Sequence, residues 1–317
     1  MRLPIGTFTS RVSSTQIHLL AACLAILLTI GCGDSQPNGS GSNSNADNQS
    51  GKVLKFSAIP DQDTTELKEK FDALAEHLSN ELGVSVENVP STDYKASVEA
   101  FKSGDIQLAW FGGLTGVQAR HAVAGAEAIV QGKSDPTFKS YFIVHKDSPL
   151  QKSNEFPMGL ADHSFSFGSP SSTSGRLMPE HFLRVNTKKS PDEFFKTAPS
   201  FSGSHDKTVE LVETGQVQSG AVNFKVYDKR VAEGKTDPET CRIVWVTPDY
   251  ADYNFTAHPD LETMFGEGFT KKLQDTLIAV DDPALLSAFP REALIQAKSE
   301  DFDGIKKVAV DLGFIRE

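Results

Sequence analysis

The stretch "FSFGSPSSTSGRLMPEHFLRV" (residues 165–185) contains a complete strand–turn–helix unit. Its apolar beginning at 165–169 predicts a buried strand, and the residues at 177–185 predict a helix. Between them, "GSPSSTSGR" (168–176) gathers hydroxyl side chains and two glycines. Pro179 lies near the start of the predicted helix, so we expect it to kink the helix or delay its start.

The alternation of strand and helix continues in both directions from this unit. Buried strands are predicted at "VLKFSAI" (53–59), "IQLAWFG" (106–112) and "SYFIVHK" (140–146). Apolar residues recur at helical spacing in "TELKEKFDALAEHLSNELG" (65–83), and further amphipathic helices are predicted in the tail, one at about 258–279. Strands separated by helices indicate α/β architecture with mostly parallel sheets.

Two α/β blocks of similar size are followed by a tail that is poor in predicted strands. We expect the tail to return to the first block, which gives lobe 1 as 53–147 plus 246–317 and lobe 2 as 148–245. The chain then crosses between lobes twice, near 146–149 and 245–250. Two lobes joined by two crossings form a hinge.

The first 52 residues are predicted to anchor the protein and not to join the fold. Residues 1–31 combine two arginines with an apolar run too short to span a membrane, which is typical of a signal peptide. The run ends in "LTIGC", which resembles a lipobox with Cys32 as the lipidated residue. The alternative is an ordinary secretory signal with an incidental cysteine. Residues 32–52 are rich in Gly, Ser and Asn, so we expect a flexible tether on a bacterial membrane, outside the cytoplasm.

Composition excludes several classes of function. The 317 residues carry a formal net charge of −11, which disfavours nucleic-acid partners. Of three cysteines, only Cys241 lies outside the signal and lipobox, and no spacing suggests a metal or a cofactor. No catalytic motif is present, and Ser174, His205 and Asp206 make a poor triad because adjacent helical side chains diverge. We therefore expect no enzyme.

The hydroxyl-rich loop is a candidate anion site. A turn from strand to helix leaves backbone N–H groups unpaired at the positive end of the helix dipole. Ser172, Thr173 and Ser174 add hydroxyl donors, and Gly175 lets a ligand approach the backbone. This combination suits an oxyanion and needs no lysine. The alternative is an ordinary N-cap.

Two further segments point to the same kind of site. In "FSGSHDKT" (201–208), His205 is a candidate donor to an oxyanion, and Asp206 is a candidate acceptor for the proton of a protonated one. The alternative for Asp206 is to complement the helix dipole. In "AWFGG" (109–113), two glycines after a strand favour a site near Phe111, while core packing is an equal alternative for Trp110.

Taken together, these segments resemble the periplasmic substrate-binding proteins of phosphate/phosphite/phosphonate-type ABC transporters, and most closely the members labelled putative selenate binders. The resemblance runs from about 53 to about 255. It implies a type II periplasmic binding protein whose two lobes close on the ligand. The segments that carry it are "IPDQD" (59–63), "DYKASVEAF" (93–101), "DIQLAWFGG" (105–113), "HKDSP" (145–149), "FGSPSSTSG" (167–175) and "GSHDKT" (203–208).

The resemblance also implies a set of ligand-binding residues. The oxyanion is held by Tyr94, Phe111, Ser172, Thr173, Ser174 and His205, and the acids Asp206 and Asp252 bind its substituent. Phe111 stands where the family often has Tyr, which removes a hydroxyl donor. Arg176 stands where an apolar residue is common, and it either pairs with a doubly charged oxyanion or faces solvent.

The expected function is capture of a small tetrahedral oxyanion (phosphonate, phosphite, phosphate or a selenate-like ion) and its delivery to an ABC permease and its ATPase. We expect a monomer without cofactor. The alternatives are a binder of an organic anion such as a sulfonate, and a ligand-sensing lipoprotein without a transport role.

Overall fold

The computed structural model describes residues 51–316. The predicted signal at 1–31, the lipidated Cys32 and all but the end of the tether at 32–52 lie outside these residues. Among the described residues, no helix combines the length and the apolar character needed to cross a bilayer.

Six strands form the first sheet, in the order β11-β4-β10-β3-β1-β2. β1 pairs parallel with β2 and β3, whereas β10 is antiparallel to β3 and β4, and β11 is antiparallel to β4. The strands are β1 (Val53–Ala58), β2 (Ser85–Asn88), β3 (Leu108–Phe111), β4 (Glu127–Gly132), β10 (Asn254–Ala257) and β11 (Leu294–Gln296). The tail thus returns to this sheet, and we call the part of the chain built on it lobe 1.

Five strands form the second sheet, in the order β7-β6-β8-β5-β9, and the part of the chain built on it is lobe 2. β6 is parallel to β7 and β8, and β5 is antiparallel to β8 and β9. The strands are β5 (Ser140–His145), β6 (Phe165–Phe167), β7 (Ser200–Phe201), β8 (Ser219–Asn223) and β9 (Cys241–Val246). Both sheets are therefore mixed, and the prediction of mostly parallel sheets was wrong.

The placement of β5 corrects the predicted lobe boundary. The sequence predicts that the strand at 140–146 belongs to lobe 1, but its backbone pairs with β8 and β9 in lobe 2. The first crossing therefore lies at 133–139 and not near 146–149. The second runs over 247–253. Phe138 and Tyr250 exchange backbone hydrogen bonds of 2.8 and 3.0 Å, so the two crossings lie side by side.

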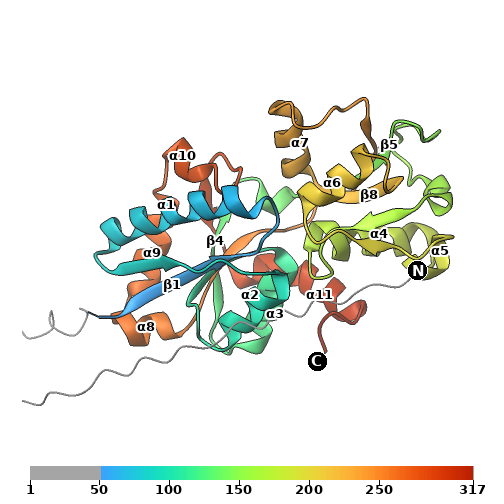
Figure 1. The fold of residues 1–317 in the computed structure, drawn as a ribbon. Helices are drawn as coiled ribbons and strands as arrows, with labels where there is room; N and C mark the ends of the chain where they lie inside the picture. The colour runs from blue at the N-terminus through green and yellow to red at the C-terminus, as the bar shows by residue number, and fades with distance from the viewer. Residues whose placement is uncertain (1–50, 317) are drawn as a thin grey trace, which may run out of the picture. The chain divides into compact units, whose positions relative to one another are not determined.

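Helices pack around both sheets (Figure 1). Lobe 1 carries α1 (Thr64–Leu82), α2 (Tyr94–Lys102), α3 (Gly113–Ala122), α8 (Asp260–Phe265), α9 (Phe269–Ile278), α10 (Pro283–Leu286) and α11 (Asp303–Asp311). Lobe 2 carries α4 (Met178–Thr187), α5 (Pro191–Phe194), α6 (His205–Glu213) and α7 (Phe224–Ala232). The single helix predicted at 258–279 is broken between α8 and α9, where Gly266 and Gly268 have positive φ angles of 102° and 85°.

Each sheet packs against apolar clusters of its own, and the cluster of lobe 1 extends to Leu177 and Met178 at the start of α4. Phe56, Phe101 and Phe255 are fully buried in lobe 1, and Phe142 and Phe165 are buried in lobe 2. The apolar residues at helical spacing in 65–83 are buried along one side of α1, as predicted. The predicted fold class, α/β with two lobes and two crossings, is confirmed.

Candidate functional site

The hydroxyl-rich loop forms a tight turn directly after β6. Ser172 caps it, because its Oγ accepts the Gly175 N–H at 2.9 Å. The first turn, Thr173–Leu177, is a π-type turn, and the regular helix α4 begins only at Met178. Pro179 lies in the first turn of α4, where its missing N–H is tolerated, and helical turns already precede it from Thr173. The turn thus presents the backbone N–H groups of a helix start together with buried hydroxyls.

His205 lies beside this turn as the first residue of α6. Its Nδ1 accepts the backbone N–H of Asn223 at 3.3 Å, so the ring proton is on Nε2. Nε2 lies 3.4 Å from Ser174 Oγ. Burial lowers the pKa of His205 to about 3, so the ring is neutral. His205 therefore supplies an uncharged N–H donor next to Ser174.

The glycines of "AWFGG" meet the turn from lobe 1. The Leu114 N–H donates to Thr173 Oγ1 at 2.9 Å, and the Gly113 N–H donates to Asp252 Oδ1 at 2.8 Å. A Cβ atom at Gly112 would lie 3.0 Å from Thr173 Oγ1 and 3.3 Å from Asp252 Oδ1. A side chain at Gly112 would therefore crowd Thr173 and Asp252 at the point where the two lobes approach each other.

Two buried polar atoms in this region have no hydrogen-bond partner among the described residues. One is Oδ2 of Asp252, whose pKa is raised to about 7 by burial. The other is the hydroxyl of Tyr94, the first residue of α2. Burial and the nearby carboxylates of Asp61 and Asp252 raise the pKa of Tyr94 well above its usual value. Because buried polar groups are normally hydrogen-bonded, both atoms are available to bond a ligand.

We call the residues Tyr94, Ser172, Thr173, Ser174, His205 and Asp252 the oxyanion cluster. It holds neutral donors from both lobes and one acid from the second crossing. Such a set can bind an oxyanion by hydrogen bonds alone.

Comparison with known proteins identifies the family. Residues 56–302 match the family described as "ABC transporter, phosphonate, periplasmic substrate-binding protein". The chain belongs to this family.

Relatives of this binding protein support the assignment. The probable ABC transporter phosphite binding protein PhnD1 of Prochlorococcus marinus is 38% identical over 84% of this chain and 91% of the relative. The phosphate-import protein PhnD of Mycolicibacterium smegmatis is 26% identical over 92% and 94%. The solved structure of P. marinus PhnD1 with methylphosphonate aligns with a TM-score of 0.79 and 37% identity, covering 83% of this chain and 99% of that one. The predicted family and the type II periplasmic binding protein fold are confirmed, and the family consists of binding proteins and not enzymes.

The sequence patterns did not predict that three further residues of this binding protein lie at the site: Asp61, Asn223 and Tyr253. The backbone carbonyl of Asp61 accepts the backbone N–H of His205 at 3.0 Å, and Asp61 Oδ2 accepts the Tyr253 hydroxyl at 2.7 Å. The Tyr253 oxygen in turn accepts Asn223 Nδ2–H at 2.9 Å. With the Asn223–His205 contact, these bonds close a ring through both lobes and the second crossing. The only signal in the sequence was that Asp61 lies two residues after the strand predicted at 53–59, within "IPDQD" (59–63).

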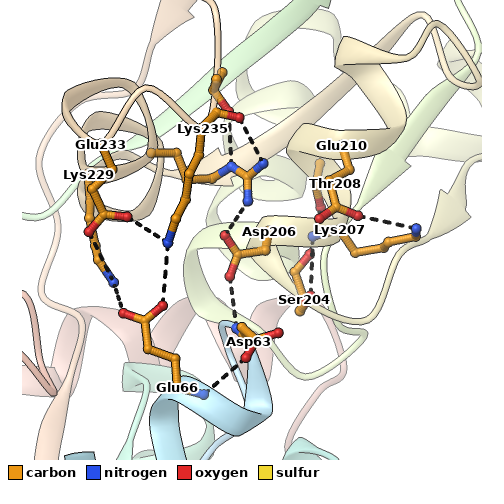
Figure 2. Close-up of polar contacts among 12 residues, drawn as sticks. Asp63, Glu66, Ser204, Asp206, Lys207, Thr208, Glu210, Lys229, Glu233 and Lys235 are labelled. Carbon is orange, nitrogen blue, oxygen red and sulfur yellow. Dashed lines mark hydrogen bonds and ion pairs between the residues drawn. The ribbon is translucent and has the colours of Figure 1, made fainter.

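Asp206 is not joined to the oxyanion cluster. Its Oδ1 pairs with Arg230 at 2.8 Å, and its Oδ2 accepts the Asp63 N–H at 2.9 Å (Figure 2). Both carboxylate oxygens are thus engaged on a different side of α6 from His205, as expected for adjacent helical residues. The predicted acceptor role is therefore available to Asp252 and not to Asp206.

Phe111 and Arg176 also lie elsewhere. The Phe111 ring is fully buried and packs edge-to-face against Phe101 in the core of lobe 1. The Arg176 guanidinium lies 4.4 Å from the centre of the Phe167 ring and pairs with Glu180 at 2.6 Å. Arg176 thus neither faces solvent nor reaches the oxyanion cluster, because Glu180 and the Phe167 ring hold it.

Proposed function

We propose that this protein is the extracytoplasmic binding component of an ABC importer and that the oxyanion cluster binds a small phosphorus oxyanion: a phosphonate, phosphite or phosphate. The observation that carries the proposal is the convergence of the Ser172–Ser174 turn, neutral His205 and two unpartnered atoms, Tyr94 Oη and Asp252 Oδ2. The named relatives of this family bind or import phosphite, methylphosphonate and phosphate.

Affinity in this proposal comes from many neutral donors in a site without water. Each donor contributes little in water, but hydrogen bonds to a charged group strengthen when the site is buried. The helix start at Thr173–Leu177 adds a favourable dipole. No lysine or arginine is needed to neutralise the anion.

Asp252 selects for a ligand that carries a proton. With the pKa of Asp252 raised to about 7, the carboxyl and a bound phosphorus oxyanion share one proton, which either of them can bring; with sulfate or selenate the proton must come from Asp252 alone, and without it the ionised carboxylate repels the anion. Phosphite, phosphate and phosphonates carry an exchangeable proton near neutral pH, and sulfate and selenate do not. The sulfonate alternative is not favoured, because a sulfonate also lacks this proton and the matched family is that of phosphonate binders.

The partners follow from the same proposal. We infer an ABC permease with its ATPase as the recipient of the ligand, a lipid on Cys32 as the link to the membrane, and a monomeric receptor. A ligand-sensing role without transport is the second candidate, and genes for a permease and an ATPase beside this one would exclude it.

Titration calorimetry with methylphosphonate, phosphite, phosphate, sulfate and selenate tests the proposal. We expect stoichiometric binding of at least one phosphorus oxyanion, and binding of sulfate and selenate that is at least about a hundredfold weaker, as for loss of a buried charged hydrogen bond. Sulfate or selenate binding as tight as the phosphorus oxyanions would contradict the role of Asp252. Absence of binding by all five would overturn the function.

A further inference from the structure

A second polar cluster joins the two lobes outside the oxyanion cluster. We call it the latch cluster, and it consists of Asp63, Glu66, Asp206, Lys229, Arg230 and Lys235 (Figure 2). Asp63 and Glu66 belong to the start of α1 in lobe 1, and the other four residues belong to α6, α7 and the segment after α7 in lobe 2.

The first latch contact runs through Asp206. Its Oδ1 is held by Arg230 within lobe 2, and its Oδ2 accepts the Asp63 N–H across the gap between lobes. The Asp63 side chain caps α1 by accepting the Thr65 and Glu66 N–H groups at 3.0 Å. Asp206 therefore binds the N-terminus of α1, where a negative charge is favoured by the helix dipole.

The second contact runs through Glu66. Its carboxylate lies 2.7 Å from Lys229 Nζ and 3.6 Å from Lys235 Nζ in lobe 2, while Lys70 holds it from within α1 at 2.6 Å. Hydrogen bonds from Lys229 and Lys70 lower the pKa of Glu66 to about 2, so it is ionised at any physiological pH. One carboxylate thus receives two cations from the opposite lobe.

These contacts are separate from the oxyanion cluster. The latch residues line a cavity of about 600 Å³, and no residue of the oxyanion cluster lines it. Glu66 and Lys235 are substantially exposed, with side-chain exposures of 36% and 51%. The latch can therefore change the balance between open and closed lobes without touching the ligand, and dissolved salt can screen it.

We propose that Asp206 and Glu66 are positioning residues that hold the lobes closed and thereby set how long the ligand stays bound. The proposal rests on the proposed function, because it assumes that lobe closure traps the ligand. A contact made only in the closed state slows opening and leaves the encounter with the ligand unchanged, so its effect falls on the dissociation rate.

Stopped-flow and calorimetric measurements with methylphosphonate or phosphite test the proposal. We expect Glu66→Gln to raise the dissociation rate about twofold to fivefold and Asp206→Asn to raise it about tenfold, with nearly unchanged association rates. Both variants should also weaken the dependence of the dissociation rate on salt. Since Asp206→Asn leaves Arg230 without its partner, Lys229→Met provides a second test that keeps the Asp206–Arg230 pair intact, and its effect should be non-additive with that of Glu66→Gln.

Glu210→Gln is the matched control. Glu210 lies on α6 and lines the same cavity, but its ion pair with Lys207 stays within lobe 2 at 3.3 Å. Wild-type dissociation rates in Glu66→Gln, Lys229→Met and Asp206→Asn would overturn the proposal, as would an equal effect of Glu210→Gln.

Hydrogen–deuterium exchange separates failure of the latch from failure of the function. The Leu114 N–H donates to Thr173 Oγ1 across the lobes and lies far in sequence from every latch residue. In ligand-free protein, the Leu114 amide should exchange its hydrogen faster in the latch variants than in the wild type or in Glu210→Gln. This readout remains valid if no phosphorus oxyanion binds, and unchanged exchange at Leu114 would count against the latch even if binding is confirmed.

Discussion

The Leu114 N–H and Thr173 Oγ1 form a 2.9 Å hydrogen bond that ties the first turn of α3 to the hydroxyl turn after β6. Thr173 therefore has two roles, because its backbone belongs to the candidate anion-binding turn and its side chain fixes the opposite lobe.

Thr173→Val tests this double role. The substitution keeps the shape of the side chain but leaves the Leu114 N–H unpaired whenever the lobes close, at a cost of about 1–3 kcal/mol. We expect binding of the phosphorus oxyanion to weaken about tenfold to a hundredfold in calorimetry. Ser171→Ala, which changes the hydroxyl two residues earlier, serves as the control and should bind normally. Normal binding by Thr173→Val would show that this contact does not contribute to closure.

Asp252→Asn tests the buried carboxyl through the stability of the ligand-free protein. Burial raises the pKa of Asp252 from 3.8 to about 7, so the folded protein holds a proton that the unfolded chain has lost. The stabilising contribution of Asp252 to the free energy of unfolding is therefore largest below pH 3.8. As the pH rises from 3.8 towards 7, this contribution falls by about 1.4 kcal/mol per pH unit.

The variant lacks this loss, so its stability relative to wild type should increase from pH 4 to pH 7 and then level off. Denaturant unfolding at several pH values gives this difference. Comparison with the variant is essential because His205, with its pKa lowered to about 3, acts in the opposite direction below pH 6.5. A difference independent of pH would mean that Asp252 is ionised in the folded protein throughout.

Asp61→Asn and Tyr253→Phe test the ring of hydrogen bonds behind the oxyanion cluster. Asp61 and Tyr253 contact each other at 2.7 Å, and the ring orients His205 through Asn223. We expect each variant to weaken binding about tenfold and the double variant to be little worse than either, because residues in contact are coupled. Strictly additive losses in calorimetry would show that the ring does not act as a unit.

The sequence predicted the parts of the site that depend on neighbouring residues. The hydroxyl turn at 172–175 and the start of α6 at His205 are set by local capping and by the switch from strand to helix, both of which are visible in the residues themselves. Pro179 lies in the first turn of α4, close to the helix start that the sequence predicts.

The errors concern contacts between distant residues. Asp206 and His205 share one helix start, but only the packing of Arg230 and Asp63, 24 and 143 residues away, decides where the carboxylate points. The apolar pattern of β5 is compatible with a strand in either lobe. Its pairing partners β8 and β9 lie far along the chain, so the pattern does not reveal which sheet it joins. Asp61 belongs to the site only because Tyr253 reaches it from the second crossing.

The paired backbones of Phe138 and Tyr250 have a mechanical consequence. Because the two crossings are hydrogen-bonded to each other, we expect them to bend together as one hinge. The lobes should then rotate about this hinge while the backbone hydrogen bonds between the crossings stay intact. Asp252 sits on this pivot, two positions from Tyr250, and its N–H donates to the Asp135 carbonyl on the other crossing at 3.1 Å. A change in the protonation of Asp252 would therefore act on the segment that joins the lobes, so we expect it to alter the angle between them.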